Sequence, residues 1–232
     1  MLAGLLLLLL PAEQAVSGAT GVAMAVRDTI KVVIGFGPLR RVMTATMITS
    51  FGAGGIMVIA VVFGRQLDHS AGAGAVLAAA YGAGTLCGAL LTAAFPFTGE
   101  PERLAIRLIA VNAVAVGVCA AAPNYAVALL TFGLAGAGNA VLFTATLAVR
   151  SVYSPPAARA QVFIIMAGFK VAAASAGIAL TGSLVAAAGP RRALLLGSAV
   201  MAISVAVALT DRRLTRNRPH SFGGVCVAIG RG

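Results

Sequence analysis

The sequence predicts an all-α polytopic membrane protein in which six transmembrane helices form one bundle. Hydrophobic residues make up 60% of the chain and charged residues only 10%, whereas charged residues make up about 25% of a typical soluble domain. The mean hydropathy is +1.00, so the chain has too little polar surface to cover a core that faces water. Its 232 residues are therefore better divided into spans of ~20 residues, the helix length that crosses a ~30 Å hydrocarbon core.

Residues 1–39 are expected to form the end of a truncated helix followed by a cytoplasmic linker. Met1 to Leu10 is apolar, but ten helical residues rise only ~15 Å, half of the hydrocarbon core. No basic residue precedes this run, so it lacks the beginning of a signal peptide. Farther along, four apolar residues lie opposite three charged ones, which is typical of a short amphipathic helix on the membrane surface. These are Val26, Ile30, Val33 and Ile34 against Arg27, Asp28 and Lys31.

The bundle is predicted at residues 40–210, with loops that contain charged or turn-forming residues. The longest stretch without a charge, residues 108–149, would form a helix of ~63 Å, about twice the membrane core. It must therefore fold back, and Pro123 and Asn124 supply the turn chemistry. Pro156 can begin the fifth helix, and Gly189 with Pro190 ends it. The spans are expected at about residues 42–64, 72–95, 104–121, 125–149, 158–188 and 193–210.

The basic residues predict the orientation of the bundle. Thirteen arginines and lysines fall on the side of the linker and of the polar tail at residues 211–232, whereas only Arg65, Arg191 and Arg192 fall on the other side. By the positive-inside rule, the linker and the C-terminal tail face the cytoplasm. This accounts for the net charge of +11 without a nucleic-acid partner, because the basic residues form no patch or stripe. We expect a multi-pass protein of the cell inner (plasma) membrane.

Glycines inside the spans predict close packing of the helices. Gly84 and Gly88 form a GxxxG pattern, which lets two helix backbones approach closely. No GxGxxG or Walker-type GxxxxGKS or GxxxxGKT motif occurs, so no cofactor is predicted. Cys87, Cys119 and Cys226 show no CxxC spacing, so neither a metal site nor a disulfide framework is expected.

Three segments resemble the C-terminal half of a major facilitator superfamily transporter. They are the basic linker VRDTIKVVIGFGPLRRVM, the loop RSVYSPPAARAQ and the turn AAAGPRRALLLG into the last helix. The resemblance covers about residues 1–210 and implies that the six spans are helices seven to twelve of that fold. The segment FPFTGEPERLAIR stands at the loop between helices eight and nine. It keeps Arg103 and Arg107 but not the glycine and aspartate of the family's gating motif in register.

The resemblance implies that helices seven, eight, ten and eleven line a central path, with nine and twelve outside. The candidate substrate-path residues on the lining helices are Lys170, Asn139, Tyr81, Thr85, Thr49 and Thr144; Thr44, Thr46, Ser50, Thr146 and Ser175 are further polar residues there. Lys170 is the sharpest candidate, because a cation inside an apolar span is costly unless it is paired, faces water or reaches the interface. Two hypotheses stand for it. Lys170 faces the central path, or it snorkels back to the cytoplasmic interface.

These observations lead us to expect transmembrane transport of a small molecule by one half of a secondary transporter, with efflux as one of the two directions left open. All six acidic residues are predicted in loops, linker or tail, so no carboxylate is expected within the spans to relay a proton. His69 and His220 lie in a loop and the tail, so no serine–histidine chemistry is available in the spans and we expect no enzyme. The partners expected are a small-molecule substrate, the lipid bilayer and a missing N-terminal half or a second copy. The alternatives are a non-transport membrane scaffold and a six-helix half-transporter that works as a homodimer.

Overall fold

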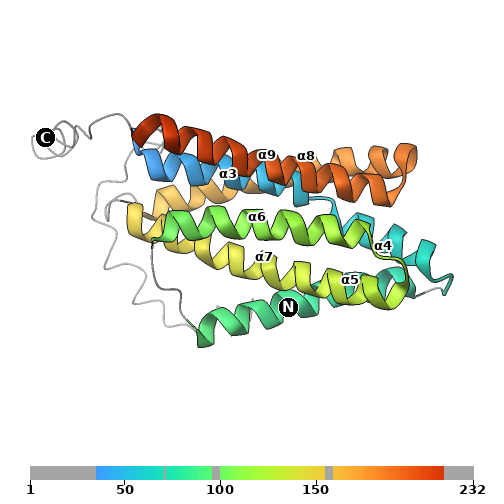
Figure 1. The fold of residues 1–232 in the computed structure, drawn as a ribbon. Coiled ribbons are helices and arrows are strands. Elements are labelled where there is room, and N and C mark those ends of the chain that lie inside the picture. The colour runs from blue at the N-terminus through green and yellow to red at the C-terminus, as the bar shows by residue number, and fades with distance from the viewer. Residues whose placement is uncertain (1–34, 71, 96–99, 155–158, 217–232) are drawn as a thin grey trace, which may run out of the picture.

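The computed structural model describes residues 35–70, 72–95, 100–154 and 159–216, and it contains only helices and short connections within those ranges. The helices are α3 (Gly37–Ala53), α4 (Ile56–Leu67), α5 (Ala73–Ala94), α6 (Pro101–Ala120), α7 (Tyr125–Tyr153), α8 (Arg159–Ala188) and α9 (Pro190–Arg216). With α3 and α4 counted as one span, six segments of the described chain are long and apolar enough to cross a membrane. They lie roughly parallel in one bundle (Figure 1), which confirms the predicted six-helix fold.

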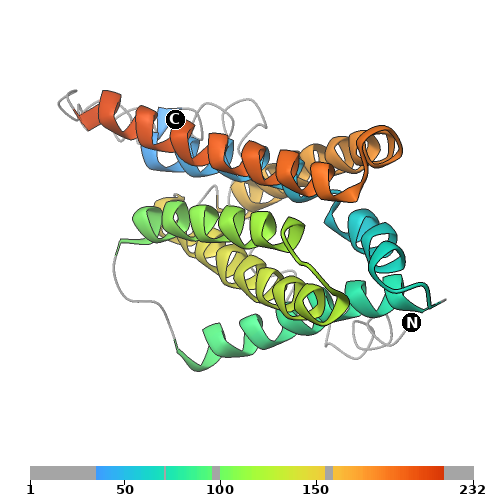
Figure 2. The same ribbon diagram turned by 45° about the vertical axis from the view of Figure 1, so that its right-hand side comes forward.

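The bundle has two layers of three helices each. Figure 2 shows α3, α8 and α9 on one side and α5, α6 and α7 on the other, with α4 reaching from the first layer to α5. Inside the layers, α3 packs against both α8 and α9, and α7 packs against both α5 and α6. Between the layers, the most extensive contact is that of α6 with α9. The layers are therefore joined mainly along one edge, and α3 and α8 face α5 and α7 along the other.

The turns between helices follow from residues that the sequence marks. The Asn124 side chain accepts a hydrogen bond from the backbone N–H of Val127 at 3.0 Å and caps the start of α7, as asparagine commonly does. Pro101 begins α6. Gly189 has φ of +81°, a backbone conformation that residues with a Cβ atom rarely adopt. This turn lets Pro190 begin α9 directly after α8.

The first span is broken at Gly54 and Gly55, whereas the sequence analysis treats residues 42–64 as one helix. Both glycines face α8 at very short range. A Cβ atom on Gly54 would lie 2.4 Å from the carbonyl oxygen of Ala174, and one on Gly55 would lie 2.0 Å from the hydroxyl of Thr181. Glycine also has a low helix propensity. The pair therefore permits both the close contact with α8 and the break between α3 and α4.

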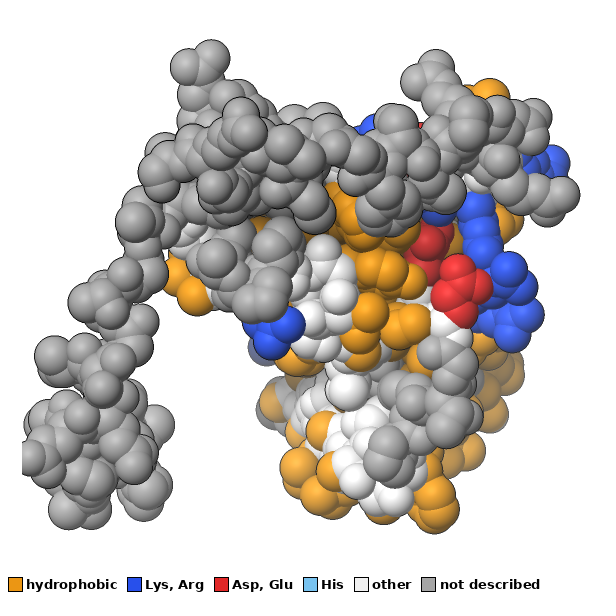
Figure 3. Space-filling view, turned by 90° about the vertical axis from the view of Figure 1, so that its left-hand side faces the viewer, with side chains coloured by type: hydrophobic (Ala, Val, Ile, Leu, Met, Phe, Trp, Pro, Cys, Tyr) orange, Lys and Arg blue, Asp and Glu red, His pale blue; other side chains and the backbone are white. Residues whose placement is uncertain are grey.

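One end of the bundle holds a network of ion pairs, which we call the basic end; α3, α6 and α8 begin there, and α7 and α9 end there. Arg40 and Arg41 each bond to Asp211 at 2.8 Å, and Arg41 also pairs with the buried Glu102. Acidic and basic side chains lie side by side on this end in Figure 3. The network joins the start of α3 to the start of α6 and the end of α9.

This network explains two differences from the sequence analysis. Helix α9 continues to Arg216, six residues past its expected end at Thr210, because Asp211 is held by two arginines at the start of α3. Glu102 and Asp211 lie on helices and not in a loop or a tail, within the first turn of α6 and the last turns of α9. Residues 1–34 and 217–232 lie outside the described residues, and so do the expected surface helix and most of the tail.

Glycine contacts are closest between α5 and α7. A Cβ atom on Gly84 would lie 1.9 Å from the carbonyl oxygen of Gly133, and one on Gly88 would lie 2.4 Å from that of Ala137. From the other side, a Cβ atom on Gly136 would lie 2.1 Å from the carbonyl oxygen of Tyr81. The predicted GxxxG pair thus lies in the contact between α5 and α7, and its hydrogen side chains set the separation of the two helices.

We expect Gly84→Ala to destabilise the bundle by about 1–3 kcal/mol, because an added methyl must push two backbones apart. Gly82→Ala on the same helix is the matched control, since a Cβ atom there meets nothing within 4 Å. Thermal unfolding in detergent, followed by circular dichroism, measures the difference. Equal melting temperatures for the two variants would contradict the packing described for α5 and α7.

Candidate functional site

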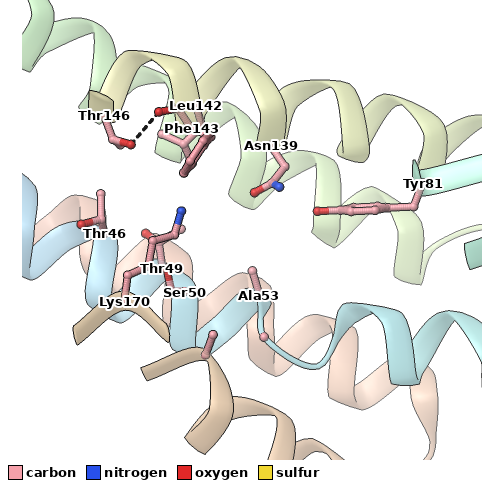
Figure 4. Close-up of a pocket in the computed structure, with 12 residues that line it drawn as sticks. Thr46, Thr49, Ser50, Ala53, Tyr81, Asn139, Leu142, Phe143, Thr146 and Lys170 are labelled. Carbon is pink, nitrogen blue, oxygen red and sulfur yellow. Dashed lines mark hydrogen bonds between the residues drawn. The ribbon is translucent and has the colours of Figure 1, made fainter. Parts of the chain in front are cut away.

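A polar cavity lies between the two layers, on the edge away from the contact of α6 with α9. It has a volume of about 170 Å³. The described residues that line it come from α3, α5, α7 and α8, together with Gly54 at the break after α3, and none comes from α6 or α9. Figure 4 shows the residues of α3 and α8 facing Tyr81 and the residues of α7 across the space. The polar side chains among them are Thr46, Thr49, Ser50, Tyr81, Asn139, Thr146 and Lys170.

Helix periodicity places these polar residues on common faces. Thr46, Thr49 and Ser50 follow one another at spacings of three and one residues, so they share one face of α3. Asn139 and Thr146 are seven residues apart, which returns them to one face of α7 after two turns. Because both faces point into the same space, the cavity gathers these polar side chains, although the larger part of its lining surface is apolar.

The three threonine hydroxyl groups of the cavity are held by hydrogen bonds within the bundle. Thr46 donates to the carbonyl oxygen of Met43 at 3.0 Å, and Thr146 donates to that of Phe143 at 2.7 Å. Thr49 shares a 2.9 Å hydrogen bond with Ser204 of α9. These hydroxyls are fixed in position by such bonds, and their oxygens keep lone pairs that can accept from a ligand.

Asn139 differs from the threonines. Its side chain is half-buried and lines the cavity from the middle of α7. Figure 4 shows its amide group on the side of the cavity toward Tyr81. An amide carries both donors and acceptors, so Asn139 can recognise either kind of polar group on a bound molecule.

Lys170 supplies the charge of the site. Its side chain extends from α8 across the cavity toward α7 (Figure 4), and Nζ lies 4.5 Å from the centroid of the Phe143 ring. The ring face attracts the ammonium group and offsets part of the cost of placing it in an apolar bundle. The side chain thus reaches from α8 toward α7 across the cavity.

The structure brings four of the six sequence candidates to the cavity: Lys170, Asn139, Tyr81 and Thr49. Thr85 and Thr144 do not line it. Thr85 donates to the carbonyl oxygen of Gly82 at 2.6 Å, and Thr144 donates to that of Ala140 at 3.1 Å. Thr144 also lies 3.5 Å from Thr92, so it faces the contact between α5 and α7. The short glycine contacts there leave no room for a cavity.

Sequence reasoning missed three residues of this region. Phe143 supports the lysine through its ring, and Gly54 places main chain at the cavity wall. Arg150 is only 2% exposed, although its position next to a predicted loop suggests a solvated side chain. Phe143 could have been predicted from the sequence, because it lies four residues after Asn139 and therefore on the same face of the helix. Arg150 could not, because its burial depends on contacts between helices.

Comparison with known proteins adds no identification: no protein-family model, no curated protein and no solved structure gives a significant match to this chain.

Proposed function

We propose that this chain is one six-helix half of a major-facilitator-type secondary transporter, and that a small molecule crosses the membrane along the cavity around Lys170. The observation that carries the proposal is the position of this cation. Lys170 lies eleven residues after Arg159, the first residue of α8, which is ~16 Å into the helix and close to the middle of a ~30 Å core. A cation at that depth, facing a polar cavity, is a mark of a transport path.

The helices around the cavity support the same function. The cavity is lined by α3, α5, α7 and α8, which are the first, second, fourth and fifth spans. The resemblance to helices seven to twelve assigns the central path to these same four positions. The break between α3 and α4 adds a second argument, because discontinuous helices commonly form the binding sites of secondary transporters.

Transport explains the cavity better than a scaffold does. A scaffold could use the same glycine contacts, since small residues at helix interfaces serve assembly as well as transport. It would gain nothing from a lysine, an amide and several hydroxyls gathered inside the bundle, because each polar group there is costly unless it is satisfied. These groups have a use when a polar molecule passes between them.

The partner that we propose is a second six-helix bundle, either a second copy of this chain or a separate N-terminal half. Secondary transporters work by rocking one repeat against another around a central site. Helix α8, which carries Lys170, is the least buried of the six spans, with 17% of its most apolar window buried. A second bundle facing α3, α5, α7 and α8 would close the path between the two halves.

The proposed location is the plasma membrane, with the basic end in the cytoplasm. The ends of the described helices carry arginines mainly at the basic end, whereas Arg65, Arg191 and Arg192 lie at the opposite end. The positive-inside rule places such an end in the cytoplasm.

Replacing Lys170 tests the transport function without knowledge of the substrate. We expect that cells producing the wild-type chain differ from cells producing Lys170→Met in the ratio of at least one small molecule inside and outside the cell. Lys170→Arg should keep part of that difference, because it preserves the charge. Untargeted mass spectrometry of cell extracts and medium, at equal protein levels in the membrane, makes the measurement.

Arg192→Met, which removes an exposed cation at the other end of the bundle, is the matched control and should behave as the wild type does. Identical metabolite ratios for the wild type and Lys170→Met would contradict the proposed transport function.

Single cysteines test the orientation. In a chain without Cys87, Cys119 and Cys226, we expect His69→Cys to react with a membrane-impermeant thiol reagent added to intact cells. Arg213→Cys at the basic end should react only after the cells are permeabilised. Both positions are exposed. Labelling of Arg213→Cys in intact cells would show that the bundle has the opposite orientation.

A further inference from the structure

A second cavity lies between α7 and α8, closer to the basic end than the site described above. It is a groove that is more open than the first cavity, and its volume of about 560 Å³ falls within the range of ~300–1,000 Å³ that is usual for small-molecule pockets. Lys170 lines both cavities, so the two are neighbours. The second cavity is lined by apolar residues except for Lys170 and Arg150.

Arg150 is a buried cation whose hydrogen bonds are incomplete. Its side chain is 2% exposed, and its Nε and Nη2 atoms have no hydrogen-bond partner among the described residues. These two nitrogens form one edge of the guanidinium, and their parallel N–H groups match the two oxygens of a carboxylate or phosphate. A buried and unsatisfied charge is strongly destabilising unless an anion pairs with it. The unpaired charge of Arg150 therefore favours an anion nearby, and both nitrogens are covered by protein atoms in this structure.

No described carboxylate fills that role. Glu100, Glu102 and Asp211 are engaged in ion pairs with arginines at the starts of α3 and α6 and near the end of α9. Asp68 lies at the opposite end of the bundle, where it accepts hydrogen bonds from Ser70. Within the described chain, no acidic residue lines either cavity. Arg150 and Lys170 thus border this apolar space with the hydrocarbon parts of their side chains, and the described bundle supplies no counter-charge for either cation.

The apolar walls indicate what the rest of the ligand is. On α7, Phe143, Leu147 and Arg150 recur at spacings of four and three residues, so they share one face. On α8, Phe163, Ala167 and Lys170 recur at the same spacings. Each face thus presents apolar side chains next to one cation. A hydrocarbon body would bury its surface against these walls while its charged group meets the cations.

We propose that Arg150 and Lys170 bind the anionic group of a small amphipathic anion, a carboxylate or phosphate on a hydrocarbon body that lies between α7 and α8. Arg150 contributes the two-nitrogen edge, which turns toward the ligand on binding because both nitrogens are covered in this structure, and Lys170 contributes a second positive charge on the side of the polar cavity. The inference rests on the proposed function in one respect: if the chain is a transporter, this anion is its substrate. Binding itself can be tested without transport.

The experiment measures equilibrium binding of radiolabelled decanoate to the full chain, purified in a non-ionic detergent. We expect saturable binding that decyl phosphate displaces and that decyltrimethylammonium, a cation with the same chain, does not. Arg150→Met should weaken binding about tenfold or more, the usual effect of losing a charge-assisted hydrogen-bonded pair. Lys170→Met should also weaken it, and Arg150→Lys should fall between Arg150→Met and the wild type, because it keeps the charge without the two-nitrogen edge.

Arg65→Met is the matched control, because Arg65 is an exposed cation at the opposite end of the bundle, and its binding should equal that of the wild type. Gel filtration and circular dichroism report folding, and if Arg150→Met does not fold, Lys170→Met and Arg150→Lys decide the test. Equal binding of decanoate and decyltrimethylammonium, or unchanged affinity in those variants, would overturn the inference. So would binding of phosphatidylglycerol without binding of decanoate or decyl phosphate, which would assign the cavity to bilayer lipid. In each of these cases, a metabolite difference between wild type and Lys170→Met would leave the transport function standing.

Discussion

Close contact of helix backbones at glycines is the constraint on which the bundle depends. Apolar side chains gain little by leaving lipid for one another, so helices in a membrane associate through tight packing and interhelical hydrogen bonds. In the first layer, a Cβ atom on Gly177 would lie 2.1 Å from the carbonyl oxygen of Phe51, and one on Gly197 would lie 2.6 Å from that of Gly52. In the second layer, Gly84 and Gly136 do the same between α5 and α7. Each layer is held together by such contacts. The cavity lies between the layers, where α3 and α8 face α5 and α7.

The distribution of charge follows from this arrangement. At the basic end, three carboxylates pair with arginines and tie together helices that are distant in the sequence. Farther into the bundle, the residues that the structure describes supply cations alone, Lys170 in the polar cavity and Arg150 beside the apolar one. The interior between α7 and α8 is therefore positive, which favours the binding of a negatively charged molecule there.

The sequence predicted much of the fold because its signals are local. Charge-free stretches mark the spans, and Asn124 and Gly189 mark turns whose chemistry depends on single residues. The same analysis found Lys170, because one charge in an apolar helix is visible without a structure. It did not find the break at Gly54 or the length of α9. Both depend on distant partners: Gly54 faces α8, and Asp211 binds Arg40 and Arg41 about 170 residues away. The burial of Arg150 depends on contacts between helices in the same way.

The most direct test of the account is whether the polar cavity opens to both sides of the membrane. Asn139→Cys, in a chain without the three native cysteines, can be treated with a small charged methanethiosulfonate from outside intact cells and from the inner face in inside-out vesicles. Leu134→Cys on the same helix, at a side chain that is 69% exposed on the outer surface of the bundle, is the control that faces lipid. The account predicts that Asn139→Cys is labelled from both sides and that Leu134→Cys is labelled from neither. Labelling of Asn139→Cys from one side only, or from neither, would contradict a transport path through this bundle.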